Sequence, residues 1–180
     1  MTLIGPDGIH AGARQVASPN FDDRPSGAVT LLVLHAISLP PGEFGGDAIE
    51  RLFTNQLDPA AHPSFVELRS VRVSAHFLVR RGGELIQFVP VHRRAWHAGV
   101  SCWRGRPRCN DFSVGVELEG AADRRFADAQ YARLSALVRA LHEVLPLREI
   151  AAHSDIAPGR KTDPGGQFEW PRLFAALAIA

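Results

Sequence analysis

Residues 28–37 read Ala28-Val29-Thr30-Leu31-Leu32-Val33-Leu34-His35-Ala36-Ile37, an almost continuous apolar run. A glycine precedes the run and two prolines follow it, so it predicts a strand buried on both faces near the centre of a sheet. His35 interrupts the run close to its C-terminal end. The strand alone leaves two interpretations open: a core histidine satisfied by backbone groups, or a metal ligand presented rigidly at the edge of a sheet.

Other runs complete the predicted sheet. Residues 71–79 and 85–89 alternate in polarity on either side of Gly82-Gly83, which predicts a β-hairpin. Residues 113–119 alternate in the same way, and residues 149–152 predict a further short strand. These runs indicate a central mixed sheet of about five strands.

Three helices are expected against this sheet. Asp47 is expected to cap a short one, and Asp128 a long one over residues 129–145, whose apolar side chains recur at helical spacing. The last helix has Pro171 in its first turn, and Phe174 and Leu177 are expected to pack it onto the core. The predicted fold class is therefore α/β (α+β), a mixed sheet flanked by helices.

Length and composition limit the class of protein. The 180 residues suit one domain over 1–180, with an irregular N-terminal arm at 1–27. The net charge of +1 supplies no field for binding nucleic acid or a membrane, and a monomer is expected. Residues 1–12 lack the basic start and apolar run of a signal peptide, which predicts a cytoplasmic protein with Cys102 and Cys109 reduced.

Two glutamates share one face of the predicted strand at 113–119. Glu119 stands at the strand end and is expected to reach water, whereas Glu117 lies deeper. Inside a cleft, Glu117 is a candidate general base. The alternative is that it pairs with one of the many arginines.

The loop His153-Ser154-Asp155-Ile156-Ala157-Pro158-Gly159-Arg160-Lys161-Thr162-Asp163-Pro164-Gly165 concentrates titratable groups between prolines and glycines. Prolines and glycines at this density interrupt helix and strand, which predicts a surface loop of defined conformation, where functional groups often lie. His153 and Asp163 are far enough apart to fold back onto one ion. Together with His35 they offer two imidazoles and a carboxylate, a set that suits catalytic Zn2+ with one position left for water.

A zinc site of this kind predicts hydrolysis, because zinc lowers the pKa of a bound water to about 7. Glu117 is placed to take the proton, and Lys161 to stabilise the oxyanion that forms when a carbonyl is attacked. The residues alone therefore predict a zinc amide or ester hydrolase. Three other histidines, His62, His76 and His97, are expected to be dispensable for metal binding.

The 153–165 loop resembles the signature loop of the zinc N-acetylmuramoyl-L-alanine amidases, a superfamily that includes the peptidoglycan recognition proteins. Further segments resemble one branch, the cytosolic AmpD-type anhydro-muramyl-peptide amidases of cell-wall recycling. The resemblance runs in order from about residue 14 to 174. The segments that carry it are 39–46, 72–76, 94–101, 109–113 and 117–120.

This resemblance implies specific roles. The family's zinc ligands fall on His35, His153 and Asp163, its catalytic glutamate on Glu117, and its oxyanion-stabilising lysine on Lys161. It implies hydrolysis of the amide between the lactyl group of anhydro-N-acetylmuramic acid and the L-alanine of the stem peptide. The implied partner is thus a small muropeptide.

The resemblance also implies substrate contacts. Arg72 and Arg108 fall where the family binds peptide carboxylates, a task suited to guanidinium groups. Trp96 falls near the sugar, although packing of its loop onto the core is an equal alternative. One departure is Ala36, where relatives have asparagine. If that asparagine bonds the peptide backbone, Ala36 lacks the contact, and a change in substrate affinity or in the choice of stem peptide is expected.

Three alternatives remain from the sequence. A catalytically weak module that binds peptidoglycan fragments would keep the fold, but such modules typically lack the ligand that Asp163 supplies. A periplasmic amidase acting on intact murein would need an export signal or a lipoprotein cysteine. In a metal-free structural protein, the His/His/Asp set would be a coincidence.

Overall fold

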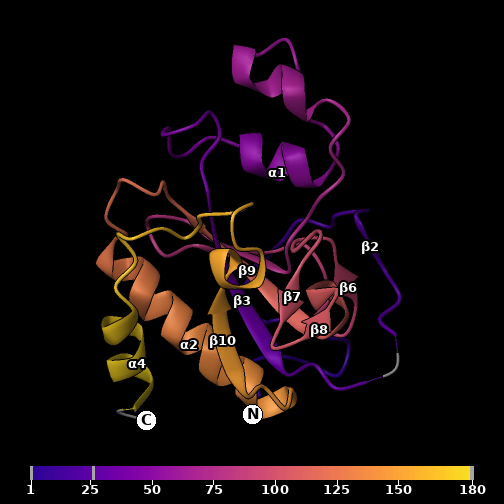
Figure 1. The fold of residues 1–180 in the computed structure, drawn as a ribbon, viewed down its shortest axis with the longest axis vertical. Helices are drawn as coiled ribbons and strands as arrows, with labels where there is room; N and C mark the ends of the chain where they lie inside the picture. The colour runs from indigo at the N-terminus through magenta and orange to yellow at the C-terminus, as the bar shows by residue number, and fades with distance from the viewer. Residues whose placement is uncertain (1, 26, 179–180) are drawn as a thin grey trace.

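The computed structural model describes residues 2–25 and 27–178, which form a mixed six-stranded sheet with helices packed against it (Figure 1). The strand order is β1-β5-β4-β9-β3-β10. Only β4 and β5 pair antiparallel in this sheet as described, and the other neighbours run parallel. The six strands, in chain order, are β1 Arg14–Gln15, β3 Leu31–Ile37, β4 Phe77–Val79, β5 Leu85–Gln87, β9 Ser113–Glu119 and β10 Glu149–Ala152.

The other elements surround this sheet. Two small antiparallel pairs lie beside it, β2 with β6 and β7 with β8. Within the described ranges, no helix is both long and apolar enough to cross a membrane. The pairs are β2 Phe21–Asp22, β6 Arg94–Ala95, β7 Cys102–Trp103 and β8 Arg106–Pro107, and the helices are α1 Ala48–Phe53, α2 Asp128–Val144, α3 His153–Ile156, α4 Trp170–Ala178 and the 3-10 turns η1 Pro63–Leu68 and η2 Cys109–Asp111.

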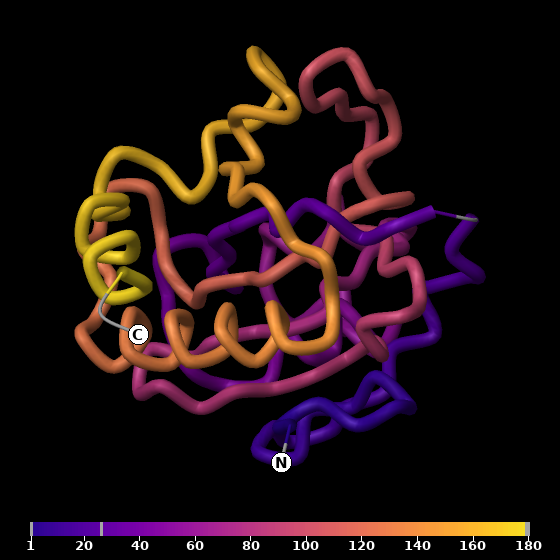
Figure 2. The backbone as a smooth tube through the Cα atoms, turned by 90° about the horizontal axis from the view of Figure 1, so that it is seen from below, coloured from indigo at the N-terminus to yellow at the C-terminus, as the bar shows by residue number. Residues whose placement is uncertain are grey.

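The two faces of β3 and β9 meet different surroundings. On one face Leu32, Leu34 and Val116 pack in the main core with the apolar side of α2. Figure 2 shows α2 running along the sheet with α4 beside it. On the other face Leu31 and Val33 pack with Ala98, Phe112 and Ile156, which come from loops and the short helix α3. The face without a long helix is therefore the one open to a functional site.

Most predicted elements are confirmed, with some differences. The long helix, the 113–119 strand and the strand at 149–152 lie where expected. The hairpin is shorter than predicted, because β4 begins at Phe77 and the chain before it runs irregularly. Ala127, not Asp128, occupies the N-cap of α2. Residues 1–27, expected to be an irregular arm, contribute β1 and β2, with positions 1 and 26 outside the described residues.

Packing of the last helix also differs from expectation. Phe174 is 49% exposed, whereas Leu173 is fully buried in the main core. The helix begins at Trp170, and this start turns position 173 toward α2 and position 174 outward. The prediction is therefore wrong for Phe174 and is confirmed for Leu177, which is partly buried and packs against the main core.

Candidate active site

Two neighbouring strands place the first pair of functional side chains. In the parallel register of β3 and β9, His35 pairs with Glu117. Residues that pair across neighbouring strands project from the same face. That face is the one opposite α2, so both side chains reach the region bordered by loops.

The loop after β10 supplies the remaining polar groups. His153 follows β10 directly and begins α3, and Asp155 Oδ2 accepts a hydrogen bond from Ala152 N at 2.8 Å. The loop then folds back, because Ser154 N donates to the carbonyl oxygen of Asp163 at 3.0 Å. This hydrogen bond brings the two ends of the 153–163 loop together, as the sequence predicted.

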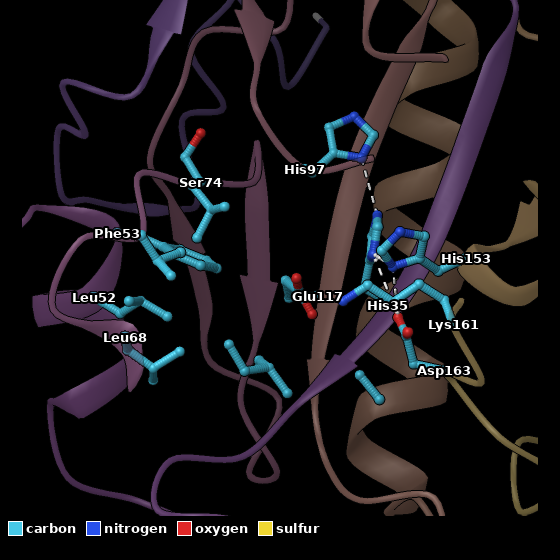
Figure 3. Close-up of a pocket in the computed structure, with 14 residues that line it drawn as sticks. His35, Leu52, Phe53, Leu68, Ser74, His97, Glu117, His153, Lys161 and Asp163 are labelled. Carbon is cyan, nitrogen blue, oxygen red and sulfur yellow. Dashed lines mark hydrogen bonds and ion pairs between the residues drawn. The ribbon is translucent and has the colours of Figure 1, made fainter. Parts of the chain in front are cut away.

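His35, His153 and Asp163 converge on one point (Figure 3). His35 Nδ1 lies 2.9 Å from His153 Nδ1 and 3.4 Å from Asp163 Oδ2, and His153 Nδ1 lies 3.1 Å from the same oxygen. Both imidazoles are buried and the carboxylate is half-buried. Three atoms with lone pairs thus face one another across about 3 Å.

The surroundings of His35 and Asp163 favour unprotonated donor atoms at these two residues. Burial lowers the pKa of His35 to about 4, against a smaller opposing effect of Asp163. Burial alone would raise the pKa of Asp163, but its hydrogen bonds with His153 and His35 hold that pKa well below the usual range. The ring of His35 and the carboxylate of Asp163 are therefore in the charge states that bind metal ions at neutral pH.

Glu117 stands beside the cluster with one carboxylate oxygen free. The residue is 9% exposed, and its Oε2 is buried with no hydrogen-bond partner in the described structure. Burial raises the pKa of Glu117 well above its usual value, the charge of Asp163 raises it further, and Lys161 lowers it. The side chain of Lys161 runs from the 153–163 loop toward Glu117 (Figure 3). A carboxyl with a raised pKa inside a cleft is typical of a general base or acid.

A cleft of about 350 Å³ opens onto these groups. One wall is polar and carries the predicted ligands with Glu117 and Lys161, while the opposite wall is apolar. Ala36 lines this cleft and also borders a second, adjoining cleft. The apolar wall is formed by Ile37, Leu52, Phe53, Leu68, Val71 and Val73.

Sequence reasoning missed this apolar wall and the role of His97. Leu52 and Phe53 were recognisable only as the buried side of a short helix, with no indication that this side faces a cleft. His97 lines the cleft, and its Nδ1 lies 2.9 Å from His35 Nε2. His76 is also buried, but its Nδ1 accepts from the backbone N–H of Gly115.

Glu119 differs from the sequence-based expectation. It is 2% exposed, and its Oε1 accepts from Arg80 Nη1 at 2.8 Å and from Gly45 N at 2.7 Å. Its Oε2 accepts from the backbone N–H of Arg81. The expected contact with water is wrong, because Arg80 and the loop at 45 cover the end of β9.

The three predicted substrate-contacting residues lie outside the set that lines the cleft. Arg72 is exposed and its guanidinium donates only to backbone carbonyls of the described chain. Arg108 is 78% exposed, and its Nε lies 3.1 Å from Asp111 Oδ2. Trp96 is half-buried, and its backbone exchanges hydrogen bonds with Ser74.

The chain is similar to known amidases over nearly its whole length. A model of the N-acetylmuramoyl-L-alanine amidase family matches residues 25–166. The 1,6-anhydro-N-acetylmuramyl-L-alanine amidase AmpD of Escherichia coli (strain K12) is 57% identical over 165 residues, which span 90% of each chain.

Solved structures agree with this similarity. A crystal structure of a selenomethionine AmpD derivative superposes with a TM-score of 0.93 at 51% identity, over 97% of this chain and 99% of that one. The amidase AmiD from Escherichia coli, solved with anhydro-N-acetylmuramic acid-L-Ala-D-gamma-Glu-L-Lys, has a TM-score of 0.61 at 28% identity, over 87% of this chain and 65% of that one. The chain therefore belongs to the N-acetylmuramoyl-L-alanine amidase family and is of the AmpD type.

Proposed function

We propose that this protein is a zinc-dependent amidase that cleaves the bond between the lactyl group of 1,6-anhydro-N-acetylmuramic acid and the L-alanine of the stem peptide. One observation carries the proposal. Three metal-binding atoms converge at the wall of a cleft, and Glu117, whose buried Oε2 has no hydrogen-bond partner among the described residues, lines the same cleft.

The donor set fits zinc. Tetrahedral ligands at about 2.0–2.1 Å from Zn2+ stand roughly 3.3 Å from one another, and the three ligand atoms here are separated by 2.9, 3.1 and 3.4 Å. Two ring nitrogens and a carboxylate oxygen this close need a cation or a shared proton between them. His35 Nδ1, His153 Nδ1 and Asp163 Oδ2 are therefore the atoms proposed to hold the ion.

Zinc supplies an activated water molecule and a Lewis acid for the amide carbonyl. In the proposed reaction the carboxylate of Glu117 accepts a proton from the water and later returns it to the leaving amine of L-alanine. Lys161 places a positive charge where the carbonyl oxygen becomes an oxyanion. Burial around Glu117 keeps bulk water from competing for that proton.

The cleft walls account for substrate selection in this proposal. The apolar wall suits the sugar ring and its lactyl and acetyl methyl groups, since it offers no polar partner for a charged group. Arg72 and Arg108 remain proposed contacts for the carboxylates of the stem peptide, and Trp96 for the sugar. Both arginines are exposed, so their guanidinium groups are accessible to the carboxylates of a bound peptide.

We further propose that the substrate is a small muropeptide of cell-wall recycling and that the protein acts in the cytoplasm as a monomer. The similarity to AmpD supports the recycling role, and the net charge of +1 argues against nucleic acid as a partner. Purified protein should elute as a monomer, and fractionated cells should hold it with the cytoplasmic enzymes.

The experiment that tests the function measures zinc content and peptide release on the same preparation. We expect about one zinc per chain, release of the stem peptide from anhydro-muramyl tri- and tetrapeptides, and much slower release from polymeric murein. Removal of zinc with a chelator should abolish release, and added zinc should restore it. Binding of the muropeptide without peptide release by the zinc-loaded protein would instead indicate a binding module.

A comparison of substrates tests the sugar preference separately. Anhydro-muropeptides and muropeptides with a reduced sugar end differ only at the terminal ring. Equal rates on both would contradict the anhydro preference and leave the amidase assignment intact.

A further inference from the structure

Both imidazoles of the proposed zinc site make their second hydrogen bond to one dipeptide, His97-Ala98. His35 Nε2 lies 2.9 Å from His97 Nδ1, and His153 Nε2 lies 3.3 Å from the carbonyl oxygen of Ala98. A metal ion at Nδ1 needs the proton of each ring on Nε2, and an acceptor facing Nε2 keeps it there. The two acceptors come from adjacent residues of a loop, not from two separate parts of the fold.

For His153 the direction of the hydrogen bond is fixed by the carbonyl group. A carbonyl oxygen only accepts, so Nε2 of His153 must carry the proton and donate to Ala98. Nδ1 of His153 is then left with a lone pair directed at His35 and Asp163. This is the state in which Nδ1 can bind an ion.

For His35 the direction of the hydrogen bond at Nε2 is fixed by a chain of three hydrogen bonds. The chain runs through His97 and Ser113 and ends at the carbonyl oxygen of Cys109. Ser113 Oγ donates to the carbonyl oxygen of Cys109 at 2.6 Å, so its own oxygen is free to accept. His97 Nε2 lies 3.2 Å from that Oγ and therefore carries the proton. His97 Nδ1 then has a lone pair and accepts from His35 Nε2, which leaves Nδ1 of His35 unprotonated.

The dipeptide is held in place by its surroundings. Asn110 Oδ1 accepts from both backbone amides, His97 N at 3.2 Å and Ala98 N at 2.8 Å. Gly115 on β9 leaves room for the ring, because a Cβ there would lie 2.4 Å from His97 Cγ. Arg160 adds a donor to the Ala98 carbonyl at 2.8 Å and ties the 153–163 loop to the same dipeptide.

We propose that His97-Ala98, held by Asn110, is the polar support that keeps both imidazoles oriented with Nδ1 free for zinc. His97 and Asn110 are positioning residues, which act on the ion through the two imidazoles. This inference rests on the proposed zinc site. It replaces the expectation that His97 is dispensable for metal.

Zinc affinity, measured by competition with a chromogenic chelator, tests the inference without relying on activity. The pair His97→Asn and His97→Leu is matched in size, and asparagine Oδ1 takes the place of the ring Nδ1 as an acceptor. We expect His97→Leu to weaken zinc binding on the order of 10–100-fold and His97→Asn to stay close to wild type. A merely space-filling role for His97 predicts equal losses in both.

A second pair of variants, at Asn110, tests the same inference if a substitution at His97 prevents folding. Asn110→Asp keeps an acceptor for both amides, whereas Asn110→Leu has the same size and none. Zinc affinity should fall in the leucine variant and largely persist in the aspartate variant. His10→Leu removes a buried imidazole far from the cleft and serves as the control for burial alone, with zinc affinity unchanged.

The outcomes separate the two proposals. If wild type binds zinc tightly and both leucine variants bind it equally well, the inference is overturned while the zinc amidase stands. If wild type binds no zinc, the metal centre is overturned and the inference with it. Circular dichroism and thermal unfolding of every variant establish that affinities are compared between folded proteins.

Discussion

His35 and Glu117 occupy paired positions on neighbouring parallel strands, and their side chains leave the sheet on the same face. The backbone ladder between β3 and β9, two buried strands, sets the distance between them. A proposed zinc ligand and a proposed general base are thus positioned by the hydrogen-bonded backbones of two neighbouring strands. The loop after β10 supplies the other three polar groups of the site, His153, Lys161 and Asp163.

Replacing Glu117 by glutamine keeps the shape of the side chain and removes its basic function. We expect the rate of peptide release to fall about a hundredfold or more, with one zinc retained per chain. Steady-state kinetics and metal analysis on the same sample check this. Glu143→Gln, an exposed change on α2, is the control. Full activity in Glu117→Gln would remove Glu117 from the mechanism.

The same substitution should stabilise the metal-free protein in a pH-dependent way. Burial raises the pKa of Glu117 well above the usual value of 4.5. Below that pH the carboxyl is neutral in both folded and unfolded chains. As pH rises, the unfolded carboxyl ionises first, which favours the unfolded state.

We therefore expect the free energy of unfolding of Glu117→Gln to exceed that of wild type by an amount that grows from about pH 4.5 toward neutrality. Denaturant unfolding of chelator-treated proteins at several pH values measures it. Glu143→Gln should show no such growth. A difference that is constant with pH would show that the carboxyl is not desolvated as its burial indicates.

The three proposed ligands can be tested one at a time. We expect His35→Ala, His153→Ala and Asp163→Ala each to hold less than half an equivalent of zinc, because two ligands do not make a zinc site. His62→Ala is the control, since His62 lies outside the set of residues that lines the cleft and caps η1 by accepting from Ser64 N. If one of these variants still holds a full equivalent of zinc, the residue changed in it is not a zinc ligand.

The cysteines are predicted to take no part in metal binding. Cys102 is exposed and Cys109 is buried, and burial raises the pKa of the Cys109 thiol. Alkylation of the folded protein should therefore modify Cys102 first and leave zinc in place. Mass spectrometry locates the modified thiol, and metal analysis follows the zinc. Release of zinc together with modification would place a thiol among the ligands.

The sequence was sufficient for much of the site because strand periodicity fixes which side chains share a face. The alternation at 113–119 placed Glu117 and Glu119 together, and β9 confirms it. The same alternation did not reveal that Arg80 covers Glu119, since that ion pair joins residues far apart in the chain. Burial at a strand end depends on what packs over it, which periodicity does not contain.

The position of His97 also depends on contacts between distant residues, which local sequence patterns do not reveal. Its segment has no clean period, so nothing local indicated a buried ring against His35. The only sequence signal was the small residue at Gly115, whose meaning appears once the ring is seen packed against it. The apolar wall was hidden for a similar reason, because Leu52 and Val73 reach it from separate segments.

The last prediction concerns Arg108, whose role as a carboxylate contact is carried by the family resemblance. The side chain is 78% exposed and paired only with Asp111 among the described residues. A contact with a remote carboxylate acts equally on bound substrate and transition state, so Arg108→Ala should raise KM and leave kcat nearly unchanged. An exposed ion pair contributes about 1 kcal/mol at most, so the expected rise in KM is about fivefold.

A substrate with its stem-peptide carboxylates amidated completes the test. If Arg108 binds a carboxylate, amidation and Arg108→Ala should each raise KM, and the two together should raise it no further than either alone. Arg148→Ala, an exposed change at the far end of β10, should have no effect on either substrate. A fall in kcat without a change in KM would place Arg108 at the reacting centre, because only an interaction made in the transition state alone behaves in that way.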